Sequence, residues 1–252
     1  KMKARLAPCH FNQPMVQEAP VVLTFCADFN RFNKWCRQRN AEPGYDNFLS
    51  FVTAAIDALL VAQNVCVAAE DEGLGICYLG TTTYMAEQII DILELPPGVV
   101  PVTTVTLGYP AEKPPLNDRL PLDAIVHQET YSDYSEEDID MIYDEKESLD
   151  SSRQFVEVNG LATLAQVFTK VRYKKEYNVT FSNKLFEVLR KQGVSLPETI
   201  RVVQGMKKKA FGGGLVIAPP SATGSPWMKK FQPYSLGIAS GWMTLRGARR
   251  RR

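Results

Sequence analysis

The 252-residue chain has the composition of a globular protein with a sizeable core, because 45% of its residues are hydrophobic and 23% are charged. Its formal net charge of +1 gives no reason to expect a polyanionic partner for the chain as a whole. The charge is uneven, however, because residues 195–252 hold eleven Lys and Arg and a single acid, Glu198. We therefore expect a folded domain at residues 1–194 and a separate basic, Gly-rich tail at residues 195–252.

The chain begins with mixed helix and loop signals over residues 1–20. The apolar, β-forming run Ala19–Ala27 then predicts a strand buried on both faces. Residues 28–45 predict a short helix followed by a loop.

The main predicted helix is Asp46–Glu72, with Asp46 or Asn47 as its N-cap. It is apolar nearly all round, which predicts burial on several sides. Its alanine seam, at Ala54, Ala58 and Ala62, would let another helix backbone come close, as in a dimer; the alternative is the central helix of a monomer. A membrane span over residues 51–69 is disfavoured by the polar residues Asp57, Gln63 and Asn64.

The stretch Glu70–Thr83 carries three glycines, Gly73, Gly75 and Gly80, around a short strand at residues 76–79. The strand stops at Gly80, where the missing Cβ lets backbone approach a flat or charged group. A helix at 85–95, a Val- and Thr-rich strand at 98–109 and a Pro-rich loop at 110–121 follow. Peripheral helices are expected from a capping pattern at Ser135 to a C-cap glycine at Gly193. This order of elements predicts an α/β or α+β fold.

Motifs for nucleophilic, metal or nucleotide-phosphate chemistry are absent from the sequence. The two histidines, His10 and His127, have no companion ligands at metal-binding spacing, so no metal site is expected. The five cysteines include no Cys-x-x-Cys pair, and with no signal peptide they predict reduced thiols in a cytoplasmic protein. A glycine turn with an Arg-bearing loop but no catalytic cluster favours a bound organic cofactor that carries the chemistry.

Six separated segments together resemble the FMN-dependent nitroreductase family, nearest to its branch of NADPH-dependent, oxygen-insensitive nitroreductases and flavin reductases. The likeness covers about residues 3–193. Its segments are residues 6–14, 25–31, 70–80, 107–112, 119–127 and 164–173.

The resemblance implies an α+β nitroreductase-like fold with a central, mainly antiparallel sheet flanked by helices. A long helix would be buried in a homodimer that holds FMN at its interface. NADPH or NADH would reduce the FMN, which would pass hydride in a ping-pong cycle to small-molecule electron acceptors: nitroaromatics, quinones or flavins. No catalytic side chain, membrane or nucleic-acid partner is implied.

The resemblance also assigns cofactor-binding roles. Tyr78, Leu79, Gly80 and Thr81 match a turn that lies along the isoalloxazine ring and supplies backbone hydrogen bonds. Gln13 matches a ring-contacting glutamine, and Arg119 matches an arginine that pairs with the FMN phosphate. Each residue also has a purely structural alternative. Gly80 would only end a strand, Gln13 would be a surface amide in a loop, and Arg119 would be an exposed loop charge.

This sequence departs from the family pattern in three places. Asn117 stands where the branch often has a second phosphate-binding lysine, which predicts weaker phosphate binding unless another cation replaces it. The family's N-terminal Arg-rich and Gly-Asn-x-Gln segments would precede Lys1, so the chain is expected to be N-terminally incomplete. The tail at 195–252 is expected to be disordered or non-homologous, as from a frameshift, with circular permutation as an alternative. The competing functional hypothesis is a flavin-free, catalytically impaired fragment acting only as a dimerisation or interaction module.

Overall fold

The computed structural model of the protein describes residues 1–112, 116 and 118–197. They form two compact units. Unit 1 comprises residues 1–112 and 179–197, and unit 2 comprises residues 116 and 118–178. Asn117 and residues 198–252, which make up nearly all of the expected tail, lie outside the described residues.

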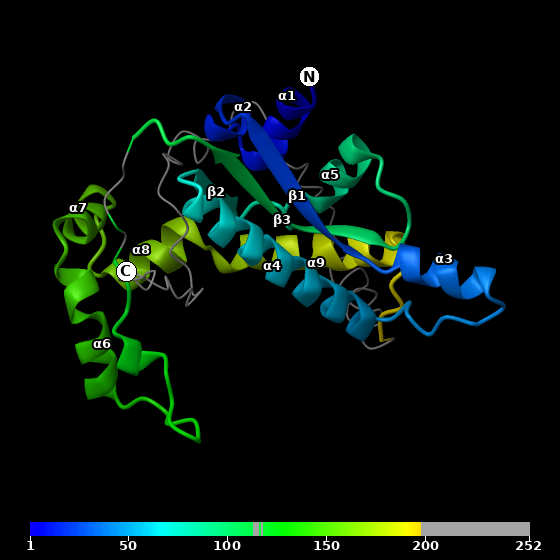
Figure 1. Ribbon diagram of the computed structural model, residues 1–252. Helices are drawn as coiled ribbons and strands as arrows, with labels where there is room; N and C mark the ends of the chain where they lie inside the picture. The colour runs from blue at the N-terminus through cyan, green and yellow to red at the C-terminus, as the bar shows by residue number, and fades with distance from the viewer. Residues whose placement is uncertain (113–115, 117, 198–252) are drawn as a thin grey trace, which may run out of the picture. The chain divides into compact units, whose positions relative to one another are not determined.

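Unit 1 is organised on an antiparallel sheet in the order β1-β3-β2, from β1 (Val21–Asp28), β2 (Gly75–Leu79) and β3 (Val99–Gly108) (Figure 1). This antiparallel sheet with flanking helices confirms the predicted α+β class. The Val- and Thr-rich β3 is central and mostly buried. The prediction that the first strand is buried on both faces is wrong, because β1 is an edge strand of this sheet and only its Ala27 is fully buried.

The long helix α4 (Phe48–Asp71) is sharply bounded at both ends. At its N-terminus the Asn47 side chain accepts a hydrogen bond from the backbone N–H of Ser50 at 3.1 Å. At its C-terminus Gly73, with φ of +76°, donates to the carbonyl oxygen of Glu70, and Leu74 donates to that of Ala69. This Schellman motif needs the left-handed conformation that glycine adopts without strain. It lets β2 start at Gly75, three residues after the C-cap Glu72, as the glycine spacing predicts.

The expected burial of α4 on several sides is wrong for the single chain. The helix packs along all three strands, but only Ser50, Ala62, Cys66 and Ala69 are fully buried. The alanine seam is also reassigned: Ala54 and Ala58 face Phe25 and Cys26 of β1 across a shallow cleft. The seam therefore lies on the side of α4 that faces the chain's own sheet, while the opposite face of the helix is exposed.

A group of short helices covers another part of unit 1. The helices α1 (Met2–Leu6), η1 (Ala7–His10, a 3₁₀ helix) and α2 (Met15–Glu18) contact one another, and α1 also packs on α5 (Ala86–Leu93), which lies against β3. Their shared apolar cluster consists of Leu6, Ala7, Cys9, Val16, Leu79 and Ile89. Helix α3 (Asn30–Gln38) follows β1.

The C-terminal helix α9 (Lys175–Lys191) enters unit 1 at residue 179 and closes its second apolar cluster. It ends as predicted at Gly193, whose φ is +86° and whose N–H donates to Arg190. The chain then continues into the core: Leu196 is buried in the cluster that contains Val188 and Leu189, and Ser195 forms a β-bridge with Asn47. The packed core thus extends past the expected domain limit at residue 194.

Unit 2 is helical. It contains η2 (Leu122–Ala124, a 3₁₀ turn), α6 (Glu136–Ser148), α7 (Asp150–Val158), α8 (Leu164–Val167) and η3 (Phe168–Arg172, one π-helical stretch). The capping pattern predicted at Ser135 is a complete capping box, with hydrogen bonds running both ways between Ser135 and Asp138.

Candidate functional site

The turn after β2 joins an exposed glycine to two buried threonines. Leu79 ends the strand in the core, Gly80 is exposed, and Thr81 and Thr82 are buried. The Thr82 hydroxyl donates to the carbonyl oxygen of Leu79 at 3.1 Å. The Thr81 carbonyl oxygen accepts hydrogen bonds from the backbone N–H groups of residues 84 and 85, just before α5 begins. The exposed backbone at Gly80 is therefore followed by a turn that several hydrogen bonds hold in place.

His10 connects this turn to Gln13. Its Nδ1 lies 2.8 Å from the Thr81 Oγ1, and its carbonyl oxygen accepts the Gln13 backbone N–H at 3.1 Å. Between them, Phe11 and Asn12 both adopt positive φ, at 53° and 55°. Consecutive left-handed non-glycine residues are uncommon and often occur at functional sites. Two of the sequence-predicted cofactor contacts, Gln13 and Thr81, are thus brought together through a residue that sequence reasoning did not assign.

The side chain of Tyr78 points away from this turn, toward α4. Its hydroxyl donates to the Gln63 side-chain oxygen at 3.3 Å. Burial and the neighbouring Cys66 thiol raise the pKa of Tyr78 far above its ordinary value, so the phenol stays protonated. Tyr78 can therefore offer a ligand only backbone groups, which is the role expected for it.

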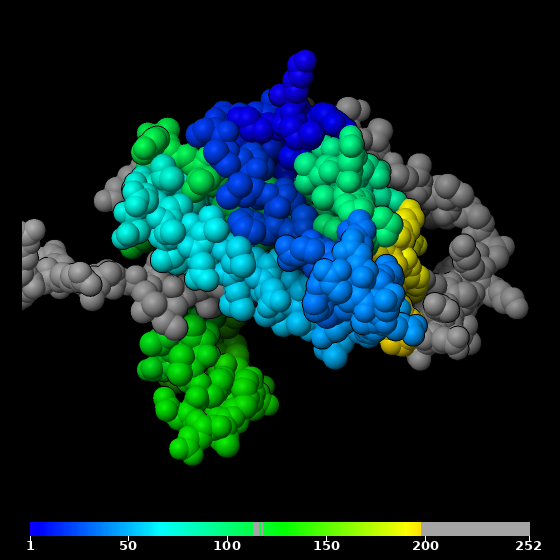
Figure 2. Space-filling model, turned by 45° about the vertical axis from the view of Figure 1, so that its right-hand side comes forward, coloured from blue at the N-terminus to red at the C-terminus, as the bar shows by residue number. Residues whose placement is uncertain are grey.

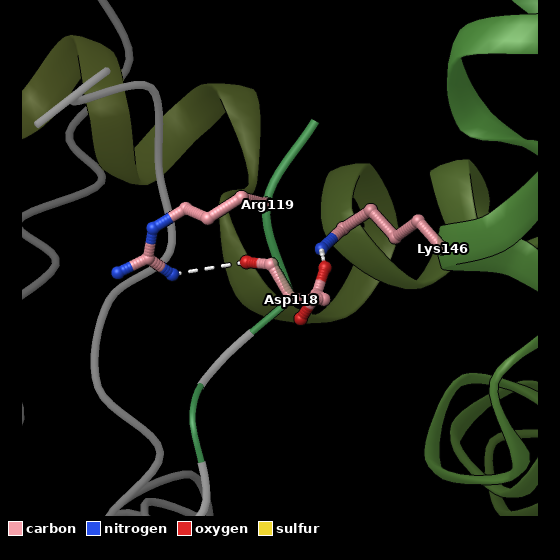
Figure 3. Close-up of polar contacts among 3 residues, drawn as sticks. All are labelled: Asp118, Arg119 and Lys146. Carbon is pink, nitrogen blue, oxygen red and sulfur yellow. Dashed lines mark hydrogen bonds and ion pairs between the residues drawn. The ribbon is translucent and has the colours of Figure 1, made fainter. Parts of the chain in front are cut away.

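Arg119 belongs to unit 2, where it lies on an exposed segment before η2. Its Nη1 donates to the Asp118 carbonyl oxygen at 2.9 Å, and the Asp118 carboxylate forms an ion pair with Lys146 of α6 (Figure 3). Lys146 is a second cation, paired with the residue before Arg119, that sequence reasoning missed because it lies on a later helix. The predicted contact at Asn117 lies outside the described residues.

His10 also shows how the site fits an organic group. It is fully buried, burial lowers its pKa to about 4, and its Nε2 has no hydrogen-bond partner among the residues that the structure describes. An unsatisfied buried polar atom costs about 1–3 kcal/mol, so a water or ligand group that paired with it would stabilise the site. An exposed glycine and a side-chain amide suit a flat, hydrogen-bonding ring. Among the described residues no cluster of His, Cys, Asp and Glu could hold a metal ion.

Comparison with known proteins points to one family. The model of the Nitroreductase family matches residues 2–109. The solved structure of a Bacteroides fragilis protein, regarded as an oxidoreductase, is 60% identical with a TM-score of 0.75, and the match covers 76% of this chain and 78% of that one. A Bacillus subtilis nitroreductase structure is 26% identical with a TM-score of 0.65, covering 77% of each chain.

Curated relatives match a shorter part of the chain. An FMN reductase (NADPH) from Bacillus subtilis is 33% identical over 132 residues, which are 52% of this chain and 53% of that protein. An oxygen-insensitive NADPH nitroreductase from Salmonella typhimurium is 34% identical over 135 residues, or 54% and 55% of the two chains. The chain therefore spans about half the length of the curated relatives it matches.

Proposed function

Because this chain belongs to the nitroreductase family, we propose that it is an FMN-dependent NAD(P)H oxidoreductase. It would take hydride from NADPH or NADH and pass it, in two separate half-reactions, to nitroaromatics, quinones or free flavins. The names of its relatives, FMN reductase and NADPH nitroreductase, support this class. The observation that carries the proposal is the pair of hydrogen bonds by which His10 links Gln13 to Thr81, beside the exposed Gly80.

Each predicted residue then has a defined task. FMN, when bound, supplies the redox chemistry, and the protein binds and orients it. Gly80 leaves room for the ring, the Gln13 amide offers it a hydrogen bond, and Arg119 pairs with the phosphate, to which a guanidinium can bind in bidentate fashion. Lys146 would take the place of the lysine replaced by Asn117, although Asp118 already neutralises part of its charge.

A comparison of FMN with riboflavin tests this assignment, because riboflavin lacks the phosphate. Flavin fluorescence quenching should show wild-type protein binding FMN. In Arg119→Ala, FMN binding should weaken by about 1.5–3 kcal/mol, roughly tenfold to a hundredfold, while riboflavin binding stays unchanged. The matched control is Arg153→Ala, since Arg153 is an exposed arginine on α7 of the same unit. Equal losses for both ligands would contradict a phosphate role for Arg119.

The alternative function, a flavin-free module for dimerisation or interaction, is distinguished by the same titration. If neither flavin is quenched by wild-type protein at any concentration up to its solubility, the oxidoreductase proposal fails. The flavin-free module for dimerisation or interaction would then be the function that remains for this fold.

We further propose that a second copy of the chain covers α4. Its outward face carries Leu49, Ile56, Leu60 and Val67, which are 72%, 53%, 59% and 54% exposed. They follow the alternating three- and four-residue spacing of a helix–helix seam, with Thr53 and Gln63 at the intervening positions. Figure 2 shows this helix at the surface, and an exposed apolar stripe of this length is typical of an interface.

A membrane is a weaker candidate for covering this stripe. By length and composition α4 is the one helix in the described part of the chain that could span a bilayer. Its inner face, however, already packs on β1, β2 and β3, and Asp57 lies beside the stripe. A charge at that depth would be costly in lipid.

The cytoplasm is the compartment we propose. All five cysteines, which the structure describes, are free thiols. Burial raises the pKa of Cys9, Cys66 and Cys77, and that of Cys26 to about 11, so these thiols remain protonated and unreactive. Free, buried thiols are characteristic of a reducing compartment.

A further inference from the structure

We propose that His10 is a positioning residue that locks the Gly80–Thr81 turn in place, and that it does so only as a neutral imidazole. The consequence for flavin binding rests on the proposed function. The effect on the turn itself does not, because it follows from contacts within the protein.

The lock is a buried hydrogen bond between segments far apart in the sequence. His10 is fully buried at the end of η1, and its Nδ1 lies 2.8 Å from the hydroxyl oxygen of Thr81, which is only 4% exposed. Thr81 directly follows the exposed Gly80. A side chain that fixes Thr81 therefore fixes the backbone at the place where the ring is expected to lie.

The segment that carries His10 is itself rigid. The N–H of Phe11 donates to Pro8 at 3.2 Å and that of Asn12 donates to Ala7 at 2.8 Å, while both residues hold positive φ. Such conformations cost free energy and persist only where surrounding bonds enforce them. His10 is thus presented to Thr81 from a fixed backbone, which is what a positioning residue requires.

The surroundings of His10 favour the neutral imidazole. Its neighbouring cluster is apolar, and burial lowers the pKa of His10 to about 4. The charged groups on the elements around it are exposed or bonded elsewhere: Lys3 donates to the carbonyl oxygens of Gln17 and Ala19, Arg5 contacts Met2, Glu87 pairs with Lys191, and Glu18 and Asp91 are exposed. The thiols of Cys9 and Cys77 remain protonated because burial raises their pKa. A protonated His10 would therefore be a buried charge without a counter-ion among the described residues.

The second nitrogen of the His10 imidazole is available to a ligand or a water molecule. Within the described part of the chain, the Nε2 of His10 has no hydrogen-bond partner although it is completely buried. Buried polar atoms are nearly always paired, and a bound water or the polar edge of a ligand would satisfy this one. The same imidazole would then fix the turn with one nitrogen and meet the bound group, directly or through water, with the other.

Hydrogen exchange of the backbone amides of residues 84 and 85, which donate to the Thr81 carbonyl oxygen, tests the lock itself when it is measured on the flavin-free protein. If opening the turn releases His10 to its ordinary pKa of about 6.5, the open population should rise about twentyfold between pH 7 and pH 5. The exchange rates, corrected for their intrinsic pH dependence, should rise by this factor. His10→Asn keeps a hydrogen-bonding group near the Nδ1 position but does not titrate, so its corrected rates should stay constant.

Two matched substitutions at the other end of the bond separate positioning from folding. Thr81→Val removes the hydroxyl with little change in shape, and Thr81→Ser keeps it. We expect Thr81→Val to raise the corrected exchange rate of the amides at 84 and 85 at least tenfold at pH 7 and to weaken FMN binding at least fivefold, and Thr81→Ser to do neither. The FMN phosphate titrates near pH 6, so affinities are compared between variants at one pH.

Each result has one meaning. Equal pH responses in wild type and His10→Asn, or equal exchange in Thr81→Val and Thr81→Ser, would overturn the role of His10. Absence of FMN binding by wild-type protein would instead overturn the proposed function, and the exchange data would still decide the role of His10.

Discussion

At the scale of single residues, Gly80 is the position that decides whether a flat ring can lie against the turn after β2. It is exposed at the end of β2, so a side chain added there would not have to enter the core. A side chain there should therefore act on the ligand and not on the fold.

We expect Gly80→Val to leave the unfolding midpoint in urea nearly unchanged and to weaken riboflavin binding at least tenfold, because the side chain would occupy the ring's position. Gly44→Val is the control, since Gly44 is exposed, has no positive φ and would place its Cβ in open space. If Gly80→Val bound riboflavin as tightly as wild type, the ring would not lie against this turn.

His10 and Lys146 show what the sequence could not supply at this scale. Gln13, Arg119 and the turn at 78–81 were found through motif resemblance, which records residues that relatives share. His10 stands three positions before Gln13, but the contact that gives it meaning joins it to Thr81 across the fold. Lys146 likewise gains its relevance from an ion pair with Asp118 that no local pattern encodes.

At the scale of elements, helix ends were predictable and burial was not. Gly73, Gly193 and Ser135 act through local backbone chemistry, so their roles follow from sequence alone. By contrast, the apolar character of Ala19–Ala27 and of α4 does not say what lies against each face. In the structure β1 is an edge strand, and half of α4 faces outward.

The N-cap of α4 gives a quantitative test at this scale. Asn47→Ala removes an acceptor for the Ser50 N–H and should lower the free energy of unfolding by about 1 kcal/mol, measured by urea denaturation. Asn64→Ala, in the same helix at an exposed position, should have no such cost, because alanine has the higher helix propensity. Equal destabilisation by both substitutions would contradict the capping role.

At the scale of the whole molecule, the apolar stripe on α4 predicts assembly. Leu60→Asp places a charge in the centre of the stripe and should convert a dimer into a monomer, as seen by sedimentation or light scattering. Met141→Asp on α6 is the control, because Met141 is also apolar, helical and 69% exposed. A wild-type protein that is monomeric in solution, or one that binds lipid vesicles through this helix, would contradict the dimer.

The central claim, that this chain is an FMN-dependent oxidoreductase, is tested most directly by anaerobic reduction of its bound flavin. Protein loaded with FMN is mixed with NADPH without oxygen, and the visible absorbance of the flavin is followed. We predict rapid loss of this absorbance, stable until a nitroaromatic or quinone is added and then fully restored. Loss no faster than that of free FMN in the same buffer would contradict the proposed activity.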